Sequence, residues 1–227
     1  MTRLRLAPSI LTIDFGDLRA QIRSVHEYVD WFHLDVMDGH YVPNITFGPS
    51  IVEAIRGATD KPLHVHLMIE EPGRYAGVFA DAGAARISFH PEVTDDPAKV
   101  VEGIASTGAG VGIAIHPDVP VSVAEAHLAD IEVVLMMTVR PGFGGQRFLP
   151  EVLPKIRAAA QTLESAGKDA DIDIEVDGGV NLDTVDDAVA AGGQILVAGS
   201  AVFDGRDAAT AAQRLRGRLD ELQKGRM

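Results

Sequence analysis

The amino-acid sequence predicts an α/β fold, a (β/α)8 TIM barrel that forms a single domain over residues 1–227. Eight short apolar runs rich in β-branched residues alternate with eight stretches of helical periodicity. Strict alternation implies parallel strands joined by right-handed crossovers. A length of 227 residues suits one barrel, and no linker-like run divides it. An open α/β sheet is the alternative, because periodicity alone does not prove closure.

The predicted strands are apolar along most of their length, as expected for parallel strands that are covered on both faces. In chain order they are Leu4–Ser9, Trp31–Val36, Leu63–Met68, Arg86–His90, Val111–Ile115, Val133–Met137, Asp173–Asp177 and Gln194–Ala198.

The stretches between the strands repeat apolar residues three or four positions apart, as a helix with one buried face requires. They are Asp17–Glu27, Pro49–Arg56, Gly73–Ala82, Pro97–Ser106, Val121–Leu128, Pro150–Ala166, Leu182–Ala191 and Ala208–Gln223. Asp96 and Asn181 precede two of these stretches and are predicted N-caps.

Composition limits the possible partners and cofactors. The formal net charge of −13 disfavours binding to nucleic acid and to anionic membranes. No apolar run is long enough to cross a membrane, so a cytoplasmic location is expected. The chain has no cysteine, so any metal must be held by His, Asp or Glu. A small phosphorylated ligand remains compatible, because backbone N–H groups are enough to bind its phosphate.

Polar residues concentrate at the ends of the predicted strands, where barrel enzymes carry their active sites. His33 and Asp35 are two positions apart and therefore share a face of their strand. If they face the barrel axis together with His66 and Asp177, two imidazoles and two carboxylates converge. That set suits one divalent ion per chain, either zinc, manganese, iron or cobalt. Asp38 lies off this face and is expected to serve the following loop.

Each of these residues has a structural alternative. A single His or Asp near a strand end more often caps or hydrogen-bonds than ligates a metal. Four at one rim favour a shared site, because buried charged groups are rare unless they are paired or metal-bound. His64 would replace His66 only if the strand presents its other face. His90 and His116 are expected to be supporting or substrate-loop residues.

Glycines follow three consecutive predicted strands. The run Pro141-Gly142-Phe143-Gly144-Gly145-Gln146 follows the sixth, Gly178-Gly179 the seventh and Gly199-Ser200 the eighth. Barrels often bind phosphate at the loops after strands 7 and 8, and glycine lets the backbone come close to a ligand. A phosphate site is predicted here, and simple tight turns are the alternative.

Met37, Met68 and Met137 fall at the ends of the second, third and sixth predicted strands. Methionine usually fills gaps in a core. At these positions the three side chains are predicted to form an apolar rim that excludes water from the site.

Several motifs together resemble the signature of ribulose-phosphate 3-epimerases. The longest is His33-Leu34-Asp35-Val36-Met37-Asp38-Gly39-His40-Tyr41-Val42-Pro43-Asn44. The others are Ser9-Ile10-Leu11 with Asp14-Phe15, His66-Leu67-Met68, Pro141–Gln146, Val176-Asp177-Gly178-Gly179-Val180 and Ala198-Gly199-Ser200. They occur in family order from about Pro8 to Phe203, nearly the whole chain.

The resemblance implies a role for each matching residue. His33, Asp35, His66 and Asp177 would bind the metal, and Asp35 and Asp177 would also be the acid–base pair. Ser9 and His66 would contact the sugar. The phosphate would be held by Gly142, Phe143, Gly144, Gly145, Gly178, Gly179, Gly199 and Ser200.

The reaction implied is epimerisation of D-ribulose 5-phosphate at carbon 3 to D-xylulose 5-phosphate, in pentose phosphate metabolism. The metal would stabilise the enediolate as a Lewis acid, while one aspartate removes a proton and the other returns one on the opposite face. A homo-oligomer is expected.

Three departures from the family pattern bear on the substrate. Thr12-Ile13 stands where the family commonly has Ser-Ala, His116-Pro117 where it often has Asn-Pro or Lys-Pro, and Arg140 where Asn or Glu is frequent. Epimerisation of another ketose phosphate, such as allulose 6-phosphate, therefore stays open, as does a non-catalytic sugar-phosphate-binding barrel. Decarboxylase, lyase and indole-type barrels rely on a lysine at a strand end, and the predicted interior ends carry none.

Overall fold

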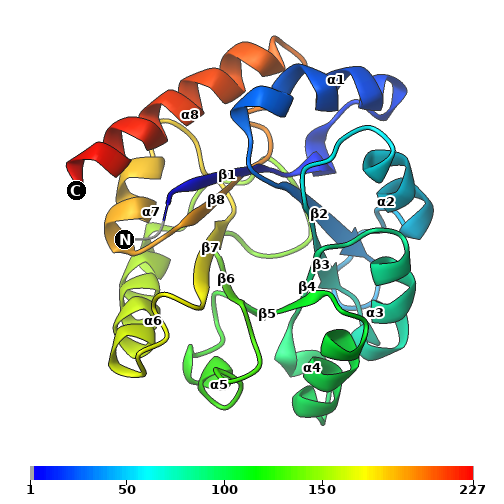
Figure 1. Ribbon diagram of the computed structural model, residues 1–227, viewed down its shortest axis with the longest axis vertical. Coiled ribbons are helices and arrows are strands. Elements are labelled where there is room, and N and C mark those ends of the chain that lie inside the picture. Colours follow the sequence, from blue (N-terminus) through cyan, green and yellow to red (C-terminus); the bar gives the residue numbers. More distant parts are fainter. Residues whose placement is uncertain (1–2, 227) are drawn as a thin grey trace.

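Eight parallel strands form one curved sheet with the helices around its outside (Figure 1). The structure, a computed structural model, describes residues 3–226, so residues 1, 2 and 227 of the predicted domain lie outside it. The strands are β1 Arg5–Pro8, β2 Phe32–Met37, β3 Leu63–Met68, β4 Arg86–Phe89, β5 Gly110–Ile115, β6 Val133–Met137, β7 Asp173–Asp177 and β8 Ile195–Ala198. Each predicted strand matches an observed one to within one residue at either end.

The sheet closes where β1 meets β2. An isolated parallel bridge joins Ser9 to His33, and the Asp30 N–H donates to the Leu6 carbonyl at 2.9 Å. On the other side β1 pairs with β8 in parallel. The predicted barrel is therefore confirmed, and the open-sheet alternative is wrong.

The helices pack their apolar faces against the outside of the barrel. They are α1 Leu18–Val25, α2 Pro49–Arg56, α3 Pro72–Asp81, α4 Pro97–Ser106, α5 Ser122–Glu125, α6 Leu153–Ser165, α7 Val185–Ala191 and α8 Ala208–Gly225. Within residues 3–226, no helix has the length and apolar character needed to span a bilayer.

Four helices, α1, α5, α6 and α7, are shorter than predicted, and one predicted N-cap is wrong. The segment predicted as Val121–Leu128 contains only the single turn of α5. Asn181 does not cap α7. Its side chain accepts from the Asp183 N–H at 2.8 Å, and the hydroxyl of Thr184 donates to the Gly179 carbonyl at 3.0 Å. These local bonds hold a turn where the helix was expected to start. By contrast Asp96 caps α4 as predicted, accepting from the Lys99 N–H at 3.1 Å.

The register between β2 and β3 sets the layers inside the barrel. His33 is level with His64, and Asp35 is level with His66. These side chains point inward, while the alternate residues Leu34, Val36, Val65 and Leu67 point outward into the core beneath the helices.

At the end of the barrel where the strands begin, charged side chains are buried beside aliphatic and aromatic ones such as Ile195 and Trp31. Arg86 is 5% exposed. Its guanidinium carbon lies 4.7 Å from the centre of the Trp31 ring, and it pairs with Asp173 at 3.6 Å. Arg5 also pairs with Asp173. The candidate site, at the end where the strands finish, therefore lies above an interior that contains buried ion pairs.

Candidate metal centre and substrate cavity

Four side chains converge at the upper end of the barrel, where the strands have their C-terminal ends. They are called the metal cage here: His33, Asp35, His66 and Asp177. His33 Nε2 lies 3.2 Å from Asp35 Oδ1 and 3.6 Å from Asp177 Oδ2. His66 Nδ1 lies 3.1 Å from the same Asp35 oxygen and 3.6 Å from the same Asp177 oxygen. All ligand atoms lie within 4.8 Å of one another. The structure thus brings the four predicted ligands together.

These distances fit a divalent metal ion. Tetrahedral coordination with bonds of about 2.0–2.1 Å places neighbouring ligand atoms about 3.3 Å apart. The four nitrogen–oxygen distances given above, from 3.1 to 3.6 Å, lie on both sides of this expected separation. The donor set of two imidazoles and two carboxylates is also one that such ions accept. The cage could therefore hold one ion without large movement of its residues.

The charges of the cage are buried and depend on one another. Burial disfavours the charged form of His33, yet Asp35 and Asp177 raise its pKa well above the ordinary 6.5. Burial also disfavours ionised Asp35, but His33 and His66 outweigh it and hold its pKa far below the ordinary range. Burial and then repulsion from Asp35 raise the pKa of Asp177. The two carboxyl groups therefore differ: Asp35 favours the ionised form, and Asp177 is protonated more easily than an ordinary aspartate.

A second buried network lies directly beneath the cage. Glu175 is 0% exposed and accepts from His33 Nδ1 at 2.8 Å and from His64 Nδ1 at 2.7 Å. His64 Nε2 lies 2.7 Å from the hydroxyl of Ser88. His64 thus shares the inward face of β3 with His66 but lies one layer deeper, so it does not replace His66 in the cage. Sequence reasoning missed Glu175 as a supporting residue, although it shares its strand face with Asp177.

Ser9 and Asp38 act on the cage and its loop in different ways. The Ser9 hydroxyl donates to Asp35 Oδ2 at 2.6 Å, which leaves Oδ1 facing the other ligands. Asp38 accepts from three backbone N–H groups, those of His40, Tyr41 and Glu70. It therefore holds the loop after β2, as expected from its position off the cage face.

The two remaining histidines lie in different surroundings. His90 is buried and its Nε2 lies 3.0 Å from His66 Nε2, so it is a neighbour of a predicted ligand. His116 accepts from the Asp118 N–H at 3.1 Å and does not line the cavity. Arg140 pairs with Asp118 at 2.6 Å and does not line it either.

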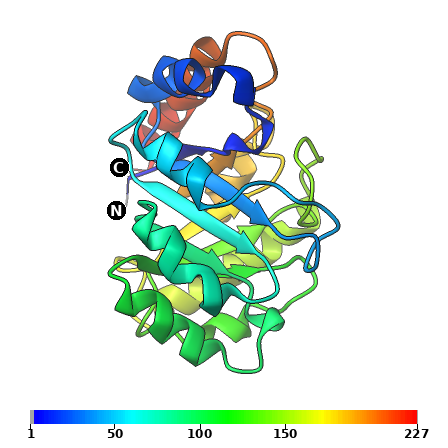
Figure 2. The same cartoon turned by 90° about the vertical axis from the view of Figure 1, so that its right-hand side faces the viewer.

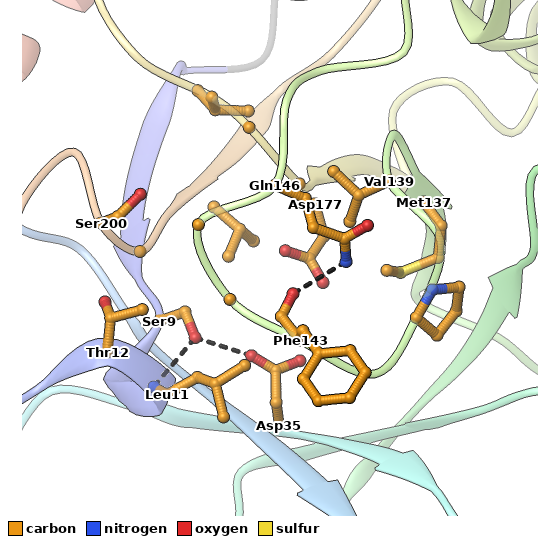
Figure 3. Close-up of a pocket in the computed structure, with 18 of the residues that line it drawn as sticks. Ser9, Leu11, Thr12, Asp35, Met137, Val139, Phe143, Gln146, Asp177 and Ser200 are labelled. Carbon is orange, nitrogen blue, oxygen red and sulfur yellow. Dashed lines mark hydrogen bonds between the residues drawn. The ribbon is translucent and has the colours of Figure 1, made fainter. Parts of the chain in front are cut away.

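A cavity of about 320 Å³ opens above the cage, a size suited to a small ligand (Figure 3). Figure 2 shows the loops after β2 and β6 at the same end of the barrel. The predicted residues that line it are Ser9, Asp35, Met37, Met68, Met137, Gly142, Phe143, Gly144, Gly145, Asp177, Gly178, Gly179, Gly199 and Ser200. His33 and His66 lie below its floor, 0% exposed.

Ten further residues line the cavity and were not predicted. They are Leu11, Thr12, Val139, Pro141, Gln146, Arg147, Val180, Asn181, Val197 and Ala201. Arg147 could have been found from its positive charge beside the glycine run. The Thr12 hydroxyl oxygen is buried without a hydrogen-bond partner within the described chain, and nothing in the sequence indicated its orientation.

The glycine loops come close to one another at the cavity. Gly179 has φ +67°, and a Cβ there would come within 2.7 Å of the Phe148 Cα. Only glycine avoids both the strain and the collision. The loop after β6 is closed by Gln146, whose side-chain amide donates to the carbonyls of Arg140 at 2.6 Å and Phe143 at 2.8 Å. Phe143 stays 55% exposed at the mouth.

The three methionines of the predicted rim lie where the cavity meets the strand ends. Met37 is 4%, Met68 1% and Met137 2% exposed, and all three line the cavity. Their side chains place apolar surface beside the buried carboxylates.

Comparisons with known proteins agree with this geometry. Residues 5–203 match the ribulose-phosphate 3 epimerase family. The chain is 48% identical to a ribulose-phosphate 3-epimerase of Bacillus subtilis (strain 168), over 94% of this chain and 99% of that protein. It is 41% identical to the protein named ribulose-phosphate 3-epimerase, cytoplasmic isoform, of Oryza sativa subsp. japonica, over 88% of this chain and 87% of that protein.

A solved structure of KGPDC from Streptococcus mutans in complex with D-R5P has the same fold. Its TM-score is 0.74 at 17% identity, covering 96% of this chain and 98% of that chain. At that identity the likeness concerns the fold alone. On the sequence matches, the chain belongs to the ribulose-phosphate 3-epimerase family and is an enzyme of the isomerase class.

Proposed function

We propose that the barrel, acting as a single catalytic domain, epimerises D-ribulose 5-phosphate at carbon 3 to give D-xylulose 5-phosphate. One divalent ion per chain, zinc, manganese, iron or cobalt, would occupy the metal cage. One observation carries this proposal: Asp35 and Asp177 both line the cavity and both belong to a cage of metal-ligand dimensions (Figure 3). A binding protein has no need for two carboxyl groups of opposite character at the floor of its pocket.

The chemistry requires a proton to leave a carbon next to a ketone and another to arrive on the opposite face. A bound ion would act as a Lewis acid toward the ketone and the neighbouring hydroxyl. One of the two aspartates takes the proton from carbon 3, and the other donates its own to the other face of the enediolate. The pair exchanges these roles with reaction direction. Each positioned group of this kind contributes roughly 10²–10⁴-fold.

The opposite pKa directions of the pair support this division of labour. In the metal-free protein burial opposes ionisation of Asp35, but His33 and His66 lower its pKa, which suits a group that removes a proton. Burial and the neighbouring Asp35 raise the pKa of Asp177, which suits a group that donates one. The Ser9 hydroxyl holds one oxygen of Asp35 in place, and it lines the cavity within reach of a bound sugar.

The other end of the substrate would lie against the glycine loops. Backbone N–H groups of Gly142, Gly144, Gly145, Gly178, Gly179, Gly199 and Ser200 would bind the phosphate, with Phe143 covering it at the mouth. Local N–H donors suit an acidic protein, because they need no positive side chain. The methionine rim would keep water from the reacting carbon. A homo-oligomer that binds neither nucleic acid nor membrane stays a prediction.

Proton NMR of D-ribulose 5-phosphate in deuterated buffer tests the proposal, with protein before and after chelation. We expect xylulose 5-phosphate with deuterium at carbon 3, lost on chelation and restored by metal. Conversion that survives thorough chelation would remove the metal from the mechanism. No conversion by a metal-loaded sample would overturn the assigned substrate, and allulose 6-phosphate would then be the ketose to try.

A further inference from the structure

His66 contacts a second buried histidine on the side away from the cage. Its Nδ1 faces Asp35 and Asp177, while its Nε2 lies 3.0 Å from His90 Nε2. His90 directly follows β4 and is 0% exposed. The two rings lie with their centres 5.1 Å apart. The nitrogen of His66 that does not face the cage is therefore covered by an imidazole and not by solvent.

The positions of the ring nitrogens determine where the protons must be. A neutral imidazole carries one N–H and one lone pair. To ligate an ion through Nδ1, His66 needs its lone pair there and its proton on Nε2. That proton can be donated only if His90 presents a lone pair at its own Nε2. His90 must then carry its proton on Nδ1.

The surroundings of His90 favour this arrangement. His90 Nδ1 lies 3.3 Å from Glu92 Oε1, and it makes no full hydrogen bond within the described residues. Glu92 therefore acts as a nearby negative charge that favours a proton on this nitrogen. A lone pair on Nδ1 would instead face a carboxylate oxygen, which is repulsive.

Glu92 is itself held by a residue from another loop. The Tyr41 hydroxyl donates to the same Glu92 oxygen at 2.8 Å. The Tyr41 ring also lies against His90, with centres 4.8 Å apart. Tyr41 belongs to the loop after β2, where its N–H bonds Asp38 at 3.2 Å. A continuous series of contacts thus runs from Asp35 through His66, His90 and Glu92 to Tyr41.

We propose that His90 is a positioning residue that fixes the proton and the ring of His66, so that His66 Nδ1 presents its lone pair to the metal cage. Glu92 and Tyr41 hold His90 in turn. This inference rests on the proposed function, because it requires an ion in the cage. On this inference the loops after β2 and β4 support the metal site through Tyr41, His90 and Glu92, although none of these three residues is a proposed ligand.

The other cage imidazole is supported differently. His33 Nδ1 bonds directly to the carboxylate of Glu175, one of the usual partners of a ligating histidine. His66 reaches its carboxylate through a second ring. Its orientation therefore depends on an acceptor atom that a substitution at one position can remove.

A purely structural role for His90 is the competing explanation, because its ring lies between those of Tyr41 and His66. Two substitutions separate the roles. His90→Phe keeps a flat ring in the stack and removes the acceptor. His90→Gln loses the ring but offers a carbonyl oxygen to the His66 N–H. His116→Phe is the matched control, since His116 follows the neighbouring strand and makes no contact with the cage.

The experiment is a titration of each metal-free protein with Co²⁺, followed by calorimetry and by the visible absorption of the bound ion. We expect His90→Phe to bind Co²⁺ about 10–100-fold more weakly, with an altered absorption band. His90→Gln should recover most of the affinity, and His116→Phe should match the wild type. Thermal unfolding of the metal-free variants checks that they are folded. If His90→Phe does not fold, His90→Leu replaces it as the variant without an acceptor, and the comparison with His90→Gln stays the same.

Two outcomes overturn the inference, and they differ from failure of the proposed function. If His90→Phe binds Co²⁺ like the wild type, or if it is impaired and His90→Gln is impaired equally, His90 acts only by packing. If the wild type itself binds no Co²⁺, the metal cage and the proposed mechanism fall together with the inference.

Discussion

Replacing Glu175 tests whether the network beneath the cage stabilises the barrel. Its carboxylate is fully buried and accepts one hydrogen bond from each of two imidazoles, at 2.8 Å and 2.7 Å. Burial opposes its ionisation, but His64 and His33 hold its pKa far below the ordinary range. Glu175→Gln and Glu175→Met change the side-chain volume little, so their effects reflect hydrogen bonding and not packing.

The structure gives the size of each effect. Gln keeps one acceptor oxygen for His33 and turns an amide N–H₂ toward His64, which can move its proton to Nε2 and donate to Ser88. Both hydrogen bonds then lose the charge assistance of the carboxylate, at about 1 kcal/mol for each, so Glu175→Gln should lose about 2 kcal/mol. Met leaves two imidazole nitrogens buried without partners: the N–H of His33 Nδ1, and Nδ1 of His64, which keeps a lone pair when its proton moves to Nε2. At about 1–3 kcal/mol for each, Glu175→Met should lose about 2–6 kcal/mol.

Urea unfolding of the metal-free proteins measures these differences. Trp31 is the one tryptophan of the chain, and its ring centre lies 6.5 Å from that of His64, so its fluorescence reports on this region. Coincident fluorescence and circular dichroism transitions would justify a two-state analysis. The reasoning is refuted if Glu175→Met unfolds at the wild-type urea concentration, or if Gln costs as much as Met.

Four other expectations concern the site. Asp177→Asn should lose at least about 10²-fold in epimerisation yet still exchange the carbon-3 proton with solvent, as followed by NMR; full epimerase activity would contradict its role. Gly179→Ala should raise KM for the sugar phosphate at least about tenfold, because a left-handed alanine costs about 1–2 kcal/mol and its Cβ meets Phe148; an unchanged KM in steady-state assays would exclude a phosphate contact. Asp38→Asn should destabilise the protein by about 1 kcal/mol at pH 7. Burial opposes ionisation of Asp38, but three backbone N–H groups lower its pKa below 3.8. The stabilisation by the carboxylate is therefore present above pH 3.8 and is lost as the pH falls through the folded-state pKa. The urea midpoints of variant and wild type should converge at that low pH, and a difference that stays constant would argue against a role for the carboxylate. Chelation should lower Tm by about 5–10 °C, since an ion at about 100 times its Kd adds about 2.7 kcal/mol; calorimetry showing no shift would mean that the folded protein held no ion.

The barrel and the cage could be predicted from the sequence because both follow from simple periodicities. Alternation along a strand placed His33 and Asp35 on one face, and strand order placed His66 beside them. Asp177 could be added because barrels carry their polar groups at one end of the strands.

The parts that escaped prediction depend on features without a period. The contact between His66 and His90 requires the orientation of two rings, which no sequence spacing reveals. The late start of α7 follows from hydrogen bonds of Asn181 and Thr184 within a turn, which compete with the helix. Thr12 enters the cavity from a short 3-10 turn after β1, whose path no hydrophobic pattern encodes.

The closure of the sheet has a mechanical consequence. In the described part of the chain, seven junctions between neighbouring strands are ladders of at least three residue pairs. The eighth, between β1 and β2, contains one isolated bridge, at Ser9 and His33, and the hydrogen bonds from the Asp30 and Trp31 N–H groups to the Leu6 carbonyl. We expect the circumference of such a barrel to change more easily at this joint than at the ladders. The joint lies beside Asp35, which accepts from the Ser9 hydroxyl, so we expect the metal cage to adjust to ions of different size. If the metal cage holds an ion, as proposed, discrimination among divalent metals should then be weak, and the supply of ions in the cell should decide which one is bound.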